Sequence, residues 1–162
     1  MAFDAFLKID GVNGESTRKG FEKQIEIQSF SWGASNPATI GAGGGGGGGG
    51  KVSVSSFNIM KRSDAASPLL FQACCQGDHY PKAVVTLNKA GGKAAVDFIK
   101  YEFEKVYVES VQWSGASGGD DTPTESVSFA FGKVSVTYTP QNPDGSKGSP
   151  AVGAWDLTTV SA

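Results

Sequence analysis

"ESVSFAFGKVSVTY", from Glu125 to Tyr138, is the stretch of sequence that decides the fold of this 162-residue chain. Apolar and small polar residues alternate along it, which is the period of a β-strand with one buried face. The alternation changes phase at Gly132, and a glycine at such a point predicts a bulge or a bend. The alternating apolar residues are Val127, Phe129 and Phe131 before the glycine, and Val134, Val136 and Tyr138 after it.

The same period of two recurs throughout the chain. It is clear over residues 3–9, and it slips phase within residues 25–32 and again within residues 52–59. Because a slip exchanges the buried and exposed faces of a strand, these strands should bend. Gly91-Gly92 supplies the positive φ angles of a tight hairpin turn between two further strand runs. We therefore predict a single all-β domain over residues 1–162, built as a closed or nearly closed β-barrel of two packed sheets.

One segment, "SPLLFQACCQG", departs from the strand pattern. Ser67 is a favoured N-cap residue, Pro68 suits the first helical position, and Gly77 is a favoured stop. We predict a short α-helix over about 67–76 that packs on the side of the barrel, because a helix of this length is unstable alone. The side chains expected to face the barrel are Leu70, Phe71 and Cys74.

Composition and charge exclude several classes of protein. The formal net charge is −2, so no basic surface is available for nucleic acid. No apolar run approaches the roughly 18 residues of a membrane-spanning helix, so membrane insertion is not expected. The first residues, "MAFDAFLKIDG", lack the basic and apolar regions of a signal peptide, so we expect a chain that is either cytosolic or exported by another route. The two cysteines, Cys74 and Cys75, are adjacent and too few for a disulfide scaffold.

A glycine-rich segment spans residues 34–51, with eight consecutive glycines from Gly43 to Gly50 followed by Lys51. The run matches the beginning of a phosphate-binding loop, G-x-x-x-x-G-K. That motif continues with Ser or Thr, which ligates magnesium, and then with a helix whose N-terminus faces the phosphate. Here Val52 follows the lysine, and the next residues alternate as a strand. We therefore predict an extended glycine-rich loop and no bound nucleotide.

The sequence contains no recognisable catalytic or metal-binding motif. His79 is the only histidine, and the compact group formed by Cys74, Cys75, Asp78 and His79 has no zinc-site spacing. No elbow-type motif surrounds any serine to pair it with this histidine. A dispersed carboxylate pair would still permit a hydrolase, but solvated strand faces explain the scattered glutamates better. These residues alone therefore predict a binding or structural module with no visible catalytic site.

Five stretches, taken in order, resemble the haemolysin-coregulated protein (Hcp) family of bacterial type VI secretion. No single stretch is diagnostic, but their shared order and spacing over nearly the whole chain make the resemblance specific. The last departs from the family's usual adjacent Gly-Trp pair, because Ala154 is inserted. The stretches are "FLKIDGVNGES" (6–16), "SFSWG" (29–33), "HYPKAVVTLNKAGG" (79–92), "GGDDTPTESVSFAFGKVSVTYTPQNPDGS" (118–146) and "GAWDL" (153–157).

The resemblance implies a structural protein that is not an enzyme and needs no cofactor. In the family, six copies form a ring, and rings stack into an inner tube that may carry effector proteins in its lumen. A contractile sheath drives this tube, tipped by a spike protein, into a neighbouring cell. The resemblance also implies that the chain stays in the bacterial cytoplasm before firing and is then secreted. The alternative is a solitary β-barrel that serves as a binding or adaptor module without forming tubes.

The resemblance further implies that the loop of residues 34–51 projects from the barrel and contacts the next ring. Ser29 and Ser31, the polar alternates beside Trp32, are expected to face the lumen, while solvent-facing positions on an outer strand fit the same pattern. Tyr107 and Trp113 fit either a subunit interface or the core. The predicted ring–ring contact residues are Ser35, Asn36, Thr39, Ile40, Gly43, Gly50 and Lys51.

Overall fold

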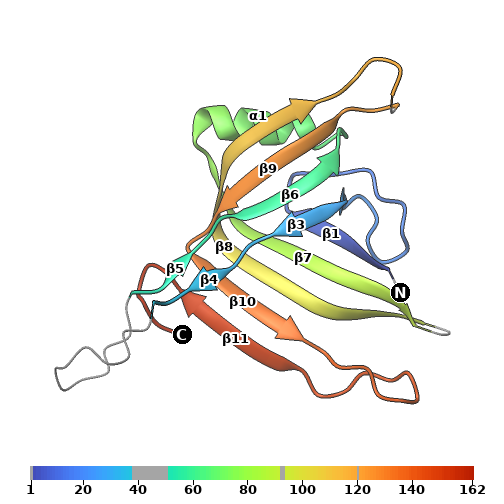
Figure 1. The fold of residues 1–162 in the computed structure, drawn as a ribbon, viewed down its shortest axis with the longest axis vertical. Helices are drawn as coiled ribbons and strands as arrows, with labels where there is room; N and C mark the ends of the chain where they lie inside the picture. Colours follow the sequence, from blue (N-terminus) through green and yellow to red (C-terminus); the bar gives the residue numbers. More distant parts are fainter. Residues whose placement is uncertain (1, 38–50, 92–93, 120) are drawn as a thin grey trace.

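The computed structural model of the chain describes residues 2–37, 51–91, 94–119 and 121–162, and strands dominate it (Figure 1). The described part contains one helix, α1 (Ser67–Gln76). The predicted mainly β architecture is therefore confirmed. The strands are β1 (Phe3–Ile9), β2 (Ile25–Ile27), β3 (Ser29–Ser31), β4 (Ala34–Ser35), β5 (Ser53–Val54), β6 (Phe57–Arg62), β7 (His79–Gly91), β8 (Ala94–Ser114), β9 (Thr124–Ala130), β10 (Lys133–Tyr138) and β11 (Ala151–Asp156).

Nine of the strands form one strongly curled sheet, and β4 and β5 form a second, two-stranded sheet (Figure 1). The path of paired strands in the large sheet is β2-β1-β7-β8-β9-β6-β3, and β10 pairs with both β8 and β11. The two ends of this path, β2 and β3, are separated along the chain only by Gln28, whose N–H donates to the Met60 carbonyl at 2.8 Å. Because the chain runs directly from one end of the path to the other, the sheet curls into a nearly closed barrel.

The predicted phase slips coincide with changes of strand partner. Within residues 25–32, β2 pairs with β1, whereas β3 pairs with β6. At Gly132 the chain leaves β9 and enters β10, and both of these strands run along β8. The Gly132 N–H donates to the Glu104 carbonyl at 2.9 Å, and a Cβ at this position would lie 3.3 Å from Cβ of Lys105. The bend expected at Gly132 is confirmed, and it faces a bend in β8 where Lys105 has a φ of 53°.

The longest hairpin joins β7 and β8, as the sequence predicts. Antiparallel pairing runs from His79 opposite Tyr107 to Gly91 opposite Ala94, with a register shift after Leu87. The predicted turn residue Gly92 lies outside the described residues. The second strand of this hairpin, β8, pairs with both β9 and β10 and is also contacted by α1.

The helix has the predicted bounds, but two details of the prediction are wrong. Gly77 ends it with a φ of 69°, the left-handed conformation expected of a C-terminal glycine. The N-cap, however, is Ala66 and not Ser67. The Ser67 hydroxyl instead accepts a hydrogen bond from Lys61 and donates one to Glu125 in the protein interior. Leu70 and Ala73 are buried, whereas Phe71 is half exposed. With 3.6 residues per turn, Phe71 is rotated away from the face that Leu70 presents to the barrel.

An aromatic cluster fills the middle of the barrel. Phe57 is buried and lies 4.9 Å from the Phe103 ring, and Phe103 lies 4.7 Å from the Phe131 ring, both measured between centroids. Trp32 meets Phe103 edge-on at 5.9 Å. These rings come from four strands or strand ends that are distant in sequence, so burial of their apolar surface holds the curled sheet together.

Candidate functional site

The glycine-rich segment leaves and re-enters the barrel through a short stem. Ala34 pairs with Val54 and Ser35 with Ser53, and Gly33 and Ser55 exchange hydrogen bonds just below the stem. The stem extends from the end of the barrel near the C-terminus (Figure 1). Lys51 is followed by the strand β5, where a phosphate-binding loop requires a helix.

Only part of the predicted ring–ring contact set can be placed. Ser35, Asn36 and Lys51 are exposed at the stem. The other predicted contact residues, Thr39, Ile40, Gly43 and Gly50, lie outside the described residues.

Ser29 and Ser31 lie on one exposed polar face of the large sheet. Ser29 stands opposite Met60 and Ser31 opposite Asn58, and Asn58 accepts a hydrogen bond from Ser128 on β9. Phe30, between the two serines, points the other way and stacks on Phe57 at 5.7 Å. The face therefore carries hydroxyl and amide groups around the exposed Met60 side chain, with the aromatic core directly behind it.

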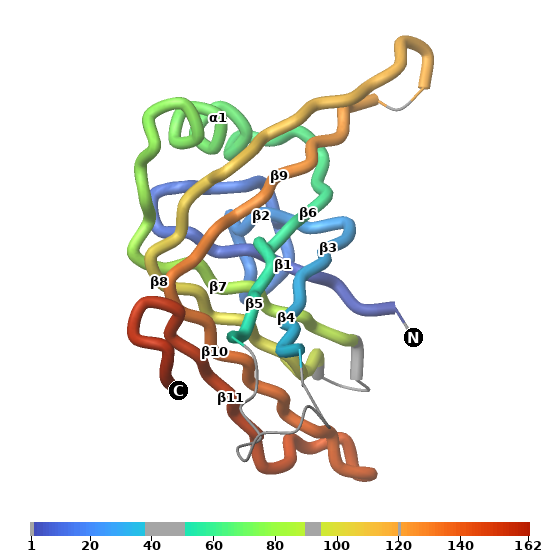
Figure 2. Tube along the Cα trace, turned by 60° about the vertical axis from the view of Figure 1, so that its left-hand side comes forward, coloured from blue at the N-terminus to red at the C-terminus, as the bar shows by residue number. Residues whose placement is uncertain are grey.

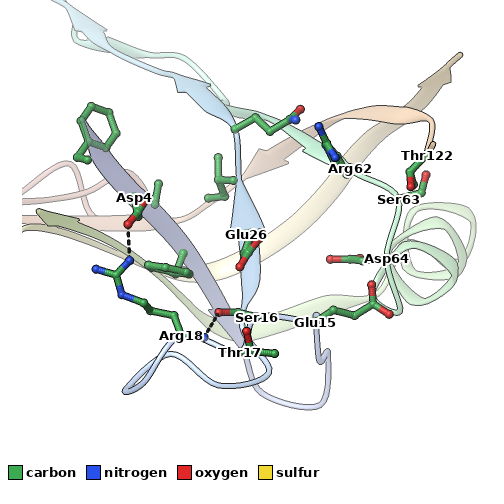
Figure 3. A pocket seen from close by; sticks show the side chains of 15 residues that line it. Asp4, Glu15, Ser16, Thr17, Arg18, Glu26, Arg62, Ser63, Asp64 and Thr122 are labelled. Carbon is green, nitrogen blue, oxygen red and sulfur yellow. Dashed lines mark hydrogen bonds and ion pairs between the residues drawn. The ribbon is translucent and has the colours of Figure 1, made fainter. Parts of the chain in front are cut away.

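A second polar feature is a groove of about 750 Å³ between β1, the loop before β2, and the end of β6 (Figure 3). Arg18 lies on the β1 side of the groove, pairing with Asp4 at 2.6 Å and donating to the Asn88 side-chain oxygen at 3.1 Å (Figure 3). Further carboxylates of Glu15, Glu26 and Asp64 line the groove. Within the described ranges, no group of three His, Cys, Asp or Glu side chains is arranged to hold a metal ion.

Beside the groove, an ionic cluster is buried between β6, β9 and the start of α1. Lys61 Nζ lies 3.3 Å from Glu125 Oε1 and 2.9 Å from Asp64 Oδ1, and it donates to the Ser67 hydroxyl at 3.0 Å. The side chains of Lys61 and Glu125 are fully buried. Burial alone would raise the pKa of Glu125, but hydrogen bonds from Ser63 and Ser67 and the charge of Lys61 outweigh it and hold that pKa below its ordinary value.

Sequence reasoning missed this cluster, although a signal was present. Lys61 stands in phase with the buried Phe57 and Ile59 on β6, and Glu125 stands in phase with Val127 and Phe129 on β9. A charge in the buried phase of a strand needs an opposite charge nearby. The register places Lys61 directly opposite Glu125.

Several aromatic side chains are exposed on the outside of the protein. Tyr107 and Trp113 are each 44% exposed, which excludes the core position left open for them by the sequence. Trp113 lies 5.6 Å from the Phe71 ring of α1, and Tyr107 lies 5.4 Å from the His79 ring. His79 thus begins β7 beside an aromatic ring and has no nucleophile paired with it in the part of the chain that is described.

None of the helices in the described ranges has the length and apolar character needed to cross a lipid bilayer. Both cysteines have free thiols, and Cys74 Sγ lies 3.5 Å from the Glu109 carbonyl oxygen.

Comparison with known proteins identifies the family. Residues 6–138 match the family described as "Type VI secretion system effector, Hcp". The chain belongs to the Hcp family. This Hcp chain is 42% identical over 158 residues to Protein hcp1 of Pseudomonas aeruginosa, covering 97% of this chain and 96% of that protein. The family consists of structural, secreted tube proteins of type VI secretion, so this Hcp chain is a structural protein and not an enzyme.

Solved structures agree with this assignment. One described as a type six secretion system protein has a TM-score of 0.91 and 38% identity, covering 98% of each chain. Hcp1 from Salmonella typhimurium has a TM-score of 0.80 and 32% identity, covering 99% of each chain. The Hcp family is also known to form oligomers. Exposed aromatic side chains are typical of surfaces where protein subunits meet.

Proposed function

We propose that this Hcp chain is the subunit of the inner tube of a type VI secretion system, and that six copies form each ring. The observation that carries the proposal is the extent of the similarity to Protein hcp1, which covers 97% of this chain. The shared part is therefore the whole barrel with its helix and stem, acting as one domain over residues 1–162. The rings stack into a tube that a contractile sheath expels behind a spike protein.

The ring–ring contact is assigned to the loop of residues 34–51. The stem β4–β5 supports this role, because it fixes both ends of the segment at one end of the barrel (Figure 1). Ser35, Asn36 and Lys51 are exposed where such a contact would begin. Thr39, Ile40, Gly43 and Gly50 complete the proposed contact set.

The lumen is assigned to the polar face that carries Ser29 and Ser31. Its hydroxyl and amide groups, including those of Asn58 and Ser128, are uncharged, and the exposed Met60 lies among them. Such a surface lets effector proteins travel along it without strong ionic attachment. In this proposal the chain waits in the bacterial cytoplasm and leaves the cell when the sheath contracts.

The mass of the purified protein tests the ring. Light scattering is expected to give six times the chain mass of 16.7 kDa, and negative-stain images are expected to show rings with a central hole. A monomer at high protein concentration would contradict the proposal and favour a solitary β-barrel binding module.

Deletion of Gly43–Gly50 tests the stacking role separately. Rings of unchanged mass are expected, with weaker ring-on-ring stacking and less secreted protein. If the deleted protein formed tubes as readily as the full chain, the loop would not be the stacking element.

A further inference from the structure

The groove that contains Glu26 and Arg62 lies where the barrel is open, between β2 and the end of β6 (Figure 3). β3 runs beside β6 as far as Ser29, which stands opposite Met60 (Figure 2). The N–H of the preceding residue, Gln28, donates to the same Met60 carbonyl, so two successive residues meet one residue of β6 and form a β-bulge. Before the bulge, β2 pairs with β1 alone among the described strands. The ladder of hydrogen bonds that closes the barrel therefore ends at Gln28.

The edge of β2 that faces the groove presents free backbone groups at Glu26. In a β-strand, the N–H and C=O groups of every second residue point to the same side. The Gln28 N–H points to β6 and away from β1, so the N–H and C=O of Glu26 point away from β1 as well. On the same edge, the Gln24 carbonyl accepts from the Ser16 N–H at 3.1 Å, whereas Glu26 has no backbone partner on this side among the described residues. Glu26 therefore offers one donor and one acceptor to a strand added from outside.

The side chains along this edge carry an excess of negative charge. Glu15, Glu26 and Arg62 line the groove, are exposed, and form no ion pair within the described ranges. The other charged side chains of the groove are already paired, and they are Asp4 with Arg18 and Asp64 with Lys61. Two free carboxylates thus stand against one free guanidinium group. The groove therefore attracts a ligand with positive charge.

We propose that this groove binds an extended basic segment of another protein, which adds to the edge of β2 as an antiparallel strand. A polypeptide matches the site better than a small cation, because only a backbone can satisfy the N–H and the C=O of Glu26 together. The volume of the groove, about 750 Å³, leaves room for side chains beside that backbone. The inference goes beyond tube formation and does not depend on it.

The pairing geometry specifies where the positive charge of the bound segment lies. The residue opposite Glu26 exchanges two backbone hydrogen bonds with it, as in any hydrogen-bonded antiparallel pair. Residues directly opposite each other in such a pair also share a face, and opposite charges there attract. A lysine or arginine opposite Glu26 is thus held by its backbone and by its side chain, while Glu15 supplies a second carboxylate in the same groove. The recognised pattern is basic residues that alternate with uncharged ones.

A capped octapeptide of alternating lysine and threonine, labelled with fluorescein, tests the inference. Threonine favours strands and carries no charge. The fluorescence anisotropy of this peptide is expected to rise to saturation as the purified full-length chain is added, and the affinity should fall with added salt. The matched peptide with glutamate in place of each lysine should not bind. A lysine peptide that does not bind, or equal affinities for the two peptides, would overturn the inference.

Methylation of the peptide backbone separates strand addition from simple attraction of charges. N-methyl groups on the lysines remove the N–H of the residue opposite Glu26, and the affinity is expected to fall by about tenfold or more. N-methyl groups on the threonines change the other edge of the peptide, so the affinity should stay within about threefold of the parent peptide. If the two methylated peptides bound equally well, the segment would not pair with β2.

Variants of the chain locate the binding site. Glu15→Gln/Glu26→Gln removes both free carboxylates and keeps the backbone of β2, so the affinity for the lysine peptide should fall by about threefold or more. Asp10→Asn is the matched control, because Asp10 is exposed but does not line the groove, and its affinity should be unchanged. An equal loss in Asp10→Asn would mean that overall charge, and not the groove, attracts the peptide.

Ring mass, measured by light scattering, is a separate readout. It should be the same for Glu15→Gln/Glu26→Gln as for the unaltered chain. If the lysine peptide did not bind and this double variant lost the ring mass, the groove would hold a second copy of the chain, and the inference would be wrong. A chain that forms rings but binds no peptide would leave the proposed tube function intact.

Discussion

At the scale of single residues, the buried cluster around Lys61 joins three elements through one ammonium group. Lys61 stands on β6, and its Nζ reaches Glu125 on β9 and Ser67 at the start of α1. Removing such charges from water is costly, and only their mutual attraction and hydrogen bonds offset that cost. Loss of one member therefore leaves another charge buried without compensation.

The first prediction concerns Lys61→Met. This change leaves the Glu125 carboxylate fully buried with only hydroxyl donors, and we expect it to lower the free energy of unfolding by about 3–5 kcal/mol at neutral pH. Urea unfolding followed by tryptophan fluorescence at one fixed protein concentration measures the loss. The double variant Lys61→Met/Glu125→Leu should recover part of it, because no charge then remains in the strand pair, although the Asp64 carboxylate still lacks the ammonium that lies 2.9 Å away in the unaltered chain.

Lys82→Met is a control for the same chemistry on the surface. Lys82 pairs with Glu102 at 3.6 Å, and its side chain is about half exposed, so the expected cost is below about 1 kcal/mol. Equal losses for Lys61→Met and Lys82→Met would show that the buried cluster contributes no more than a surface pair.

The second prediction concerns pH. The pKa of Glu125 is lower in the folded protein than its ordinary value of 4.5, so the folded state favours the charged form. The stability that this provides is complete above about pH 4.5 and is lost as the pH falls through the lower folded-state pKa. Urea midpoints measured from neutral pH downward should therefore fall more steeply for the unaltered chain than for Glu125→Gln. Parallel curves would show that Glu125 does not contribute to acid sensitivity.

Strand periodicity predicts individual buried positions well, but it does not predict pairing. The alternation around Gly132 correctly indicates that Val127, Phe129 and Val134 are buried. The same alternation places Lys61 and Glu125 in buried phases, and only the register of β6 and β9, which are far apart in sequence, shows that they neutralise each other. Charge compensation over such a separation is a property of the folded sheet.

At the scale of elements, Gly14 allows the loop after β1 to lie directly against the backbone leading into β2. Its N–H donates to the Lys23 carbonyl at 2.9 Å. A Cβ at this position would lie 2.5 Å from the Gln24 carbonyl oxygen and 2.7 Å from Cα of Ile25. The obstacle is backbone, so it cannot rotate away as a flexible side chain would.

The third prediction follows from that close approach. Gly14→Ala should push the loop away from β2 and lower the free energy of unfolding by about 1–3 kcal/mol, measured by urea unfolding. Gly33→Ala is the matched control, because no atom of the described residues lies within 4 Å of a Cβ there, and the expected change is within about 0.5 kcal/mol. A Gly14→Ala protein as stable as Gly33→Ala would mean that the loop yields without cost.

Element bounds follow from local signals, while their contacts do not. Pro68 and Gly77 predict the helix correctly because both act within one turn of it. The orientation of the helix depends on which face fits the barrel, so Leu70 is buried and Phe71 is not. In the same way, phase slips locate the bends of the strands, but the exchange of partners from β1 to β6 around Gln28 depends on closure of the whole sheet.

At the scale of the whole molecule, the curled sheet separates surfaces by chemistry. The aromatic core lies on one side of β3 and β6, and the uncharged polar face lies on the other. The proposed tube uses this separation, because the polar face would line its lumen. The lumen assignment therefore predicts that Ser31 is enclosed only in stacked rings.

The fourth prediction tests that enclosure with a single thiol at position 31. In a background with Cys74→Ser and Cys75→Ser, the Ser31→Cys variant provides one thiol on an exposed strand position. A small maleimide should label this thiol at similar rates in stacked tubes and in unstacked protein, because it diffuses along the lumen. A maleimide attached to a large polymer should label it much more slowly in stacked tubes, since the polymer cannot enter the tube. If the polymer reagent labelled tubes as fast as unstacked protein, Ser31 would lie on the outer surface and the lumen would be lined by another face of the sheet.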